Sequence, residues 1–373
     1  MIKKLNNLSV NFLYFAFFLS ILWDLYHPIY GKIFDIIGYI FIFCSLFVKS
    51  FISDVSYKFN TADLFWKIPI LFISLYSSFF FPLISFSIVS GILCSFFLPI
   101  YFRDEFKNYH FYNIIKALFL FLFFTQLIQI FLYFSIGYNL DFGGLIGFNN
   151  SRNEGGDFFR ASGILAEANA IVVTQSILFL MLNRIKRNNL IMIIYFISLI
   201  ISFSMLGIGI AFIFFILLQL QNLKFFKFTH IFSLLIVLTL LLLIFYKLGY
   251  LQIVYDIYKF RLDADSNDIS LYLRLFRPTK IPLYELLFPH SYDIANEIVP
   301  SNAYYIGLYF WGLFFIYFIF RVLFYFNKNY ILYLVFLSIL LSYQMYSSLL
   351  FWIFISFLIT YKTNDVNYVK KTY

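Results

Sequence analysis

Long apolar runs, separated by short polar segments, occupy most of this 373-residue chain. A membrane-spanning helix needs about 20 predominantly apolar residues, and many of the runs approach that length. Hydrophobic residues make up 62% of the chain and charged residues only 12%, about half the charged share of a soluble domain. A soluble fold of this size could not hide that much apolar surface. The pattern therefore predicts an all-α, polytopic membrane protein that forms one integral membrane domain, 1–373.

The run lengths predict about twelve transmembrane helices. We place them at 6–23, 33–52, 64–81, 82–102, 111–136, 162–183, 190–205, 207–222, 229–247, 303–324, 330–345 and 346–361. Three of the longest runs are each divided into two spans, at Pro82, at Ser204 with Gly207, and at Gln344. The segment 162–183 carries polar residues near its start, so we expect it to enter the membrane partly as a broken helix. Irregular backbone at that depth is tolerated only where protein or a polar cavity covers it.

Lysine and arginine residues give this layout an orientation. With the N-terminus inside, 18 of the 27 lysines and arginines fall on inner segments and nine on outer ones. Short loops of membrane proteins collect these residues on the cytoplasmic side, whereas long loops cross largely regardless of charge. Most of the nine outer residues lie in two long outer loops, 137–161 and the larger 248–302. The net charge of +9 is therefore interpreted as a topology signal rather than as a nucleic-acid footprint, and both termini are predicted to be cytoplasmic.

The first candidate site is the stretch from Arg160 to Ala170, where the first outer loop meets the membrane. A guanidinium at that position can bind a phosphate in bidentate fashion. Glu167, about two turns further on if the segment is helical, is costly at the start of an apolar span, and ionisable residues at such depth usually serve a function. The alternative is that Arg160 and Glu167 neutralise each other, or that Arg160 reaches lipid headgroups.

A second candidate lies in the larger outer loop, which we expect to contain short helices. Arg274 and Arg277 are three residues apart, so on a helix they share one face and could grip a diphosphate together. They could instead anchor an amphipathic helix to anionic lipid.

The end of the same loop provides the third candidate. His290 is the only histidine in either long outer loop and is a suitable general base near neutral pH, although a structural role is the alternative. Asn302 and Tyr304 lie where the chain re-enters the membrane. They could hydrogen-bond sugar hydroxyls, or serve as a helix cap and an interfacial anchor.

Several common sites are missing from the sequence. It contains no Walker loop, no GxGxxG after a strand and no HExxH. Cys44 and Cys94 both lie in apolar runs, without metal-type spacing. We therefore expect no metal and no cofactor. An enzyme of this design would take a substrate that is already attached to lipid, from the outer leaflet.

The stretch Arg160-Ala-Ser-Gly163-Ile-Leu-Ala-Glu167, together with the many spans and the large late outer loop, resembles the O-antigen polymerases and their relatives, the O-antigen ligases. The resemblance covers about residues 110–330. The family pattern is roughly Arg-x-x-Gly-aromatic-x-Glu-Pro, and Ala168 replaces the proline here. The segment from Ser202 to Gly207 is also similar to a Ser- and Gly-bearing span of the family. In the late loop Arg274 fits, but the Gly-x-Gly of the family is absent and Ser301-Asn302 replaces its His-Asn, which weakens the ligase interpretation most.

The resemblance implies a metal-independent membrane glycosyltransferase of lipopolysaccharide biosynthesis in the bacterial inner membrane. It would transfer a growing glycan from undecaprenyl pyrophosphate onto a lipid-linked repeat unit. Arg160 and Arg274 would neutralise the pyrophosphate, Arg277 would support them, and Gly163 would belong to the substrate-binding stretch. Glu167 or His290 would act as the base. Expected partners are lipid-linked oligosaccharides, membrane lipids, a chain-length regulator and a flippase, with no nucleic acid.

Three alternatives remain at this stage. One is an O-antigen ligase that transfers finished glycan to lipid A core. Another is a lipid-linked glycan flippase, which should carry its cationic residues within the spans, along a central cavity. The last is a structural membrane subunit. The clustering of the outer cations in two loops favours chemistry at the outer face.

Overall fold

The computed structural model is helical in nearly all of the residues that it describes, and those residues contain no strand. The described residues are 2–25, 32–53, 61–78, 82–145, 148, 161–165, 167–202, 204–222, 287–288, 303–326, 329–340 and 348–361. The helices are α1 (Ile2–Ile21), α2 (Ile33–Ser50), α3 (Thr61–Ser78), α4 (Pro82–Tyr101), α5 (Arg103–Lys107), α6 (Tyr109–Ile136), α7 (Phe142–Leu145), α8 (Ala168–Ile185), α9 (Asn189–Ile201), α10 (Met205–Asn222), α14 (Ala303–Trp311), α15 (Leu313–Tyr325), α16 (Tyr330–Ile339) and α17 (Leu349–Thr360).

Three of these helices, α2, α6 and α8, are long and apolar enough to cross a membrane. At about 1.5 Å per residue, the 28 residues of α6 extend for about 42 Å. Further apolar helices, including α9, α15 and α17, are shorter than a full span. The all-helical class predicted from the sequence is therefore confirmed for the described residues, and three of their helices are candidate membrane spans, while the total of twelve spans stays a prediction.

The ends of several helices follow local sequence signals. The Asn108 side chain accepts a hydrogen bond from the His110 N–H and so caps α6, and Asn188 and Asn329 cap α9 and α16 in the same way. Gly137 ends α6 in the left-handed conformation, at φ +68°. The predicted breaks at Pro82 and Ser204 are confirmed, because α4 begins at Pro82 and Ser204 separates α9 from α10. The predicted break at Gln344 and the predicted span 229–247 lie outside the described residues.

One predicted span is wrong as a continuous helix. Residues 303–324 form two helices, α14 and α15, which meet at Gly312 with φ +54° and ψ −134°. A side chain at Gly312 would place its Cβ 2.5 Å from the backbone oxygen of Leu287. Only glycine combines this backbone conformation with such a close approach. The break therefore follows from tertiary packing against the large predicted loop.

Many large apolar side chains are exposed on the surface of the molecule. Along α6, Phe121, Phe124, Ile128 and Phe131 are between 43% and 68% exposed. Their spacing of three to four residues puts them on one helix face. Contiguous apolar surface of this kind is rare on soluble monomers and is the surface that a lipid bilayer solvates.

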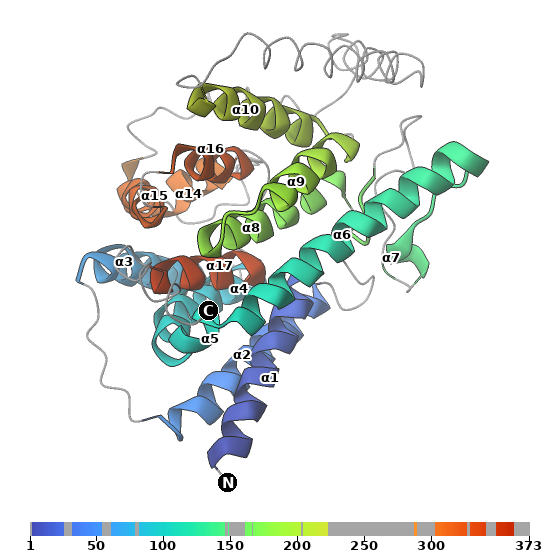
Figure 1. The fold of residues 1–373 in the computed structure, drawn as a ribbon. Helices are drawn as coiled ribbons and strands as arrows, with labels where there is room; N and C mark the ends of the chain where they lie inside the picture. Colours follow the sequence, from blue (N-terminus) through green and yellow to red (C-terminus); the bar gives the residue numbers. More distant parts are fainter. Residues whose placement is uncertain are drawn as a thin grey trace.

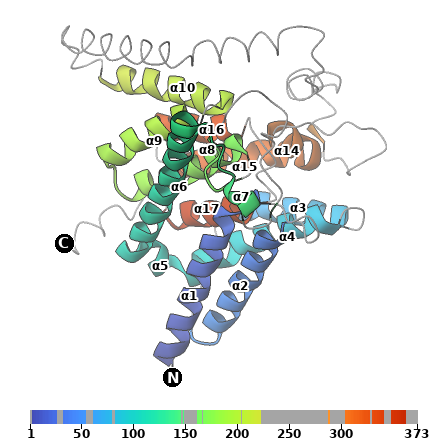
Figure 2. The ribbon, with the colours of Figure 1, turned by 90° about the vertical axis from the view of Figure 1, so that its right-hand side faces the viewer.

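Helix α17 forms the centre of the fold. All 12 of its residues are buried, and a helix that is apolar on every side must be surrounded by protein or lipid. It packs against α4, α8, α1 and α15 among others, and both views place it in the middle of the molecule (Figures 1 and 2). Helix α8 is the second interior helix and packs against α6, α16, α9 and α17.

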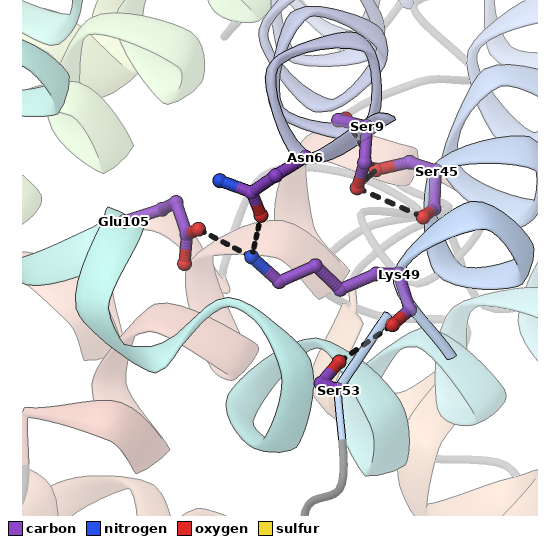
Figure 3. A network of polar contacts seen from close by, with 6 residues as sticks. All are labelled: Asn6, Ser9, Ser45, Lys49, Ser53 and Glu105. Atoms are coloured by element: carbon purple, nitrogen blue, oxygen red, sulfur yellow. Dashed lines mark hydrogen bonds and ion pairs between the residues drawn. The ribbon is translucent and has the colours of Figure 1, made fainter. Parts of the chain in front are cut away.

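Helices α1 and α2 lie side by side and form the most extensive helix pair (Figure 2). Figure 3 shows the polar contacts near their predicted inner ends. The Lys49 ammonium donates to Asn6 Oδ1 at 2.5 Å and to Glu105 Oε1 at 2.7 Å. Ser9 and Ser45 exchange hydrogen bonds with each other's backbone carbonyls. These contacts join α1, α2 and α5 through residues that the charge pattern assigns to one side of the membrane.

The interface of α4 with α17 provides a test of the packing. A Cβ at Gly91 would lie 2.0 Å from Trp352 Cδ1, whereas a Cβ at Gly209 of α10 would meet nothing within 4 Å. We expect Gly91→Ala to destabilise the protein by about 1–3 kcal/mol, because the interior has no room for the methyl group. The matched control, Gly209→Ala, should leave stability unchanged or slightly raised, because alanine favours helix. Thermal unfolding of the purified protein in detergent measures both variants, and equal melting temperatures would contradict the packing.

Candidate functional site

The sequence-predicted site residues fall into two groups. Gly163 and Glu167 are described, and Tyr304 falls in α14, although its side chain is outside the description. The remaining five predicted residues lie outside the described residues: Arg160, Arg274, Arg277, His290 and Asn302. The expected joint role of Arg160 and Arg274 at the pyrophosphate therefore stays a prediction. The described part of the candidate site is the segment that ends the first loop.

Residues 161–165 form a short non-helical turn that is buried in the protein. Ala161, Ser162, Gly163 and Leu165 are buried, and the Leu165 N–H donates to the Ser162 carbonyl at 3.2 Å. Helix α8 begins only at Ala168, with Glu167 as its N-cap residue. The broken entry expected for this segment is confirmed. A continuous helix from Arg160 to Glu167 is excluded, because Gly163 has φ +61°.

Gln129 of α6 holds the middle of this turn. Its Nε2 donates to the Gly163 carbonyl at 3.0 Å, and its Oε1 accepts from the Gly163 N–H at 2.8 Å. The same Nε2 also donates to the Leu140 carbonyl at 2.8 Å. One buried amide therefore satisfies three backbone groups, at both ends of the first outer loop.

Gln126, one helical turn earlier on α6, holds the start of the turn. Its Nε2 donates to the Ala161 carbonyl at 3.3 Å, and its Oε1 accepts from Gln175 Nε2 at 2.9 Å. Nearby on α8, Thr174 Oγ1 accepts from the Trp23 indole N–H at 2.9 Å. The three glutamines are almost fully buried. A continuous series of side-chain amides thus joins α8 and α6 to the irregular segment.

Gly163 fits this position for two separate reasons. Its φ of +61° lies in the left-handed region that favours glycine. A Cβ at this position would also lie 2.4 Å from Ile171 Cδ1 and 2.7 Å from Thr125 Oγ1. The glycine of the Arg-x-x-Gly pattern is therefore required here by both conformation and space.

The start of α8 is held from another helix. Asp24, which follows α1, accepts a hydrogen bond from the Glu167 N–H at its Oδ2, at 3.0 Å. Glu167 itself makes no side-chain cap bond. The carboxylate that accepts from the N–H at the start of α8 therefore comes from a distant part of the same chain, Asp24. A negative group is favourable at this end of a helix. The contact fixes the backbone of Glu167, and the side chain is about half-buried.

A second described contact comes from the large predicted loop. Leu287, three residues before His290, lies with its backbone against Gly312 at the α14–α15 break. The break between α14 and α15 therefore contacts the described residues Leu287 and Phe288 of this loop.

Buried charges form a separate cluster between α3 and α15. Arg321 Nη2 donates to Asp63 Oδ1 at 2.8 Å, and the Tyr325 hydroxyl donates to the same oxygen. Lys67 is 4% exposed, and its ammonium donates to the Ser95 carbonyl at 2.6 Å. Each of these two cations has a protein partner. In the part of the chain that is described, no group of three or more His, Cys, Asp or Glu side chains could hold a metal ion.

The sequence interpretation did not identify Gln126, Gln129, Gln175 and Asp24. A usable signal was present, because Gln126 and Gln129 lie three residues apart inside an apolar run and therefore share a helix face. Their partners lie about 35 residues away along the chain, and no local pattern specifies that pairing. The arrangement holds the backbone of Ala161, Gly163 and Glu167 in a fixed position at the edge of the apolar interior.

Two glycines with left-handed backbones test the turn. Gly163→Ala should be strongly destabilising, because strain of about 1–2 kcal/mol adds to the clash with Ile171. Gly137→Ala is the matched control, since Gly137 has a similar φ of +68° but no atom within 4 Å of an added Cβ. Thermal unfolding in detergent should show a larger decrease in melting temperature for Gly163→Ala than for Gly137→Ala. Equal decreases would refute the close packing of Gly163 against Ile171 and Thr125.

Comparison of the chain with protein-family models, with curated proteins and with solved structures gives no match. The residues themselves carry the case for a function. They are the irregular segment from Ala161 to Glu167, the glutamines and the aspartate that hold it, and the two predicted outer loops.

Proposed function

We propose that the chain is a membrane glycosyltransferase that polymerises lipid-linked repeat units of a surface polysaccharide, as the O-antigen polymerases do. The proposed donor is a growing glycan on undecaprenyl pyrophosphate, and the acceptor is one repeat unit on the same carrier. A hydroxyl of the acceptor attacks the anomeric carbon of the donor, and the bond to the pyrophosphate oxygen breaks. The proton of the hydroxyl passes to a base, for which Glu167 and His290 are the candidates.

The leaving group explains the choice of arginines. A departing lipid pyrophosphate is a polyanion, so fixed guanidinium groups stabilise the charge that develops on it. Arginine suits this role because it remains charged and can bind phosphate with two parallel hydrogen bonds. We assign this role to Arg160 and Arg274, with support from Arg277. Asn302 and Tyr304 are proposed to bind sugar hydroxyls, and we place the reaction at the outer face of a bacterial cytoplasmic membrane.

The observation that carries the proposal is the buried turn at 161–165. In the resembling pattern, a glycine separates an arginine from a glutamate. Here that glycine, Gly163, has a left-handed backbone and no space for a side chain. Breaking a helix at the edge of an apolar interior is costly, and irregular backbone in such places is commonly associated with function. A segment built only to span the membrane would be more stable as a continuous helix.

A lipid-linked glycan transporter is the second candidate, supported by one observation. Ionisable residues buried within apolar helices often line a transport path. Asp63 and Lys67 are buried in this way, and Arg321, which is partly buried, pairs with Asp63. Arg321 bonds to Asp63 and Lys67 bonds to a backbone carbonyl, so both have partners within the protein. We therefore favour the polymerase.

Substitution of the two arginines tests the proposal in cells. We expect Arg160→Ala and Arg274→Ala each to abolish long polymer and to leave single repeat units on lipid A core, because the leaving pyrophosphate is no longer neutralised. Gel separation of the extracted polysaccharide measures the length distribution, with Gly209→Ala as a control for expression. Normal ladders in both arginine variants would contradict the polymerase.

Deletion of the whole protein separates the alternatives further. Full-length polymer retained on the undecaprenyl carrier would instead identify a ligase.

A further inference from the structure

We propose that Gln129 is a positioning residue that closes the first outer loop at its base and thereby holds the buried turn that follows Arg160 in the sequence and precedes Glu167. The role of Arg160 in this inference rests on the proposed function. The closure of the loop rests only on the hydrogen bonds of Gln129. Gln129 is not part of the sequence pattern that resembles the polymerases.

The hydrogen bonds of Gln129 reach both sides of the loop. Leu140 lies at the start of the predicted loop 137–161, and Gly163 lies just beyond its end. The Gln129 amide donates to the carbonyls of both residues and accepts from the Gly163 N–H. The two N–H donors and the oxygen of the amide are therefore all used, and Gln129 is only 2% exposed.

The loop ends need this closure because their backbone lies in the protein interior. Ala161, Ser162 and Gly163 are buried and not helical, so their backbone polar groups need partners from elsewhere in the protein. A buried polar group without a partner costs about 1–3 kcal/mol. Gln126 supplies the partner at the Ala161 carbonyl, and Gln129 supplies those at Gly163.

The consequence for Arg160 follows from the chain itself. Arg160 directly precedes Ala161 in the sequence, and the Ala161 carbonyl accepts a hydrogen bond from Gln126. On the other side of the turn, Asp24 fixes the backbone of Glu167. The turn next to the proposed pyrophosphate ligand is therefore held by Gln126 and Gln129, and the backbone of one proposed base is held by Asp24.

The test uses the full-length protein in nanodiscs with lipid-linked repeat units as substrate. Gln129→Met keeps the side-chain volume but removes all three hydrogen bonds. We expect the polymerisation rate per folded protein to fall about 10- to 100-fold, as for a misplaced reacting group. In an Arg160→Lys background, Gln129→Met should lower the polymerisation rate by less than about threefold. The effects of two substitutions are not additive when one residue acts through the other.

A matched control separates positioning from lost stability. Ser45→Ala also removes buried hydrogen bonds, between α1 and α2, but lies far from the loop along the chain. We expect its effect on the rate to be the same factor in both backgrounds. Hydrogen exchange of the amides at 161–165 should be faster in Gln129→Met and unchanged in Ser45→Ala.

A milder variant covers the case in which Gln129→Met does not fold. Gln129→Asn keeps an amide with both donors and the acceptor but is one methylene shorter, so it lengthens the three hydrogen bonds and introduces no charge. It should show the same loss of additivity with Arg160→Lys, at a smaller cost in rate. Expression and size-exclusion profiles identify which variant is used.

Two outcomes would overturn the inference. One is an equal factor of rate loss for the Gln129 variant in both Arg160 backgrounds, which would indicate a general loss of stability. The other is faster exchange at 161–165 with an unchanged rate, which would show that the closure does not matter for chemistry. If the wild-type protein forms no polymer from these substrates, the proposed function is wrong. Unchanged exchange at 161–165 in Gln129→Met, by contrast, would refute the loop closure whatever the protein catalyses.

Discussion

A backbone N–H or C=O that leaves a helix inside an apolar interior must find another hydrogen-bond partner, and this requirement shapes the described structure. Most of the chain meets it by remaining helical. Where a helix begins or ends in the interior, a polar side chain from elsewhere supplies the missing partner. Asp24 does so for Glu167, Asp35 accepts from the Leu349 N–H at the start of α17, and Arg184 donates to the Tyr361 carbonyl at its end.

The turn at 161–165 is the largest departure from helix within the described interior, and it has the most elaborate support. Two glutamines from α6 and an aspartate after α1 hold a segment of only a few residues. Such support is needed because each unsatisfied group in an apolar medium costs several kcal/mol. That so many buried amides are devoted to one short turn is the physical reason to associate this turn, rather than the helices, with function.

Much of the fold could be predicted from the sequence, because helix formation and helix ends depend on local patterns. The break at Pro82 followed from a residue that is favoured in the first turn of a helix. Helix α6 ends at the predicted position because Gly137 adopts a left-handed conformation. The break at Gly312 was not predicted, because a glycine within an apolar run is compatible with either a helix or a break. Its conformation is set by the backbone of Leu287, which is 25 residues away along the chain.

By itself, the sequence determined the helical class of the described residues and the apolar character of the helices that are long enough to span a membrane. It also marked Gly163 and Glu167 as part of an unusual segment, because composition and short-range patterns carry that information. Only the tertiary structure decided that this segment is a buried turn and that Gln126, Gln129 and Asp24 hold it. These side chains are separated from the turn by about 35 to 140 residues of sequence. A glutamine in an apolar run reveals a need for a hydrogen-bond partner, but the partner is chosen by how the helices pack.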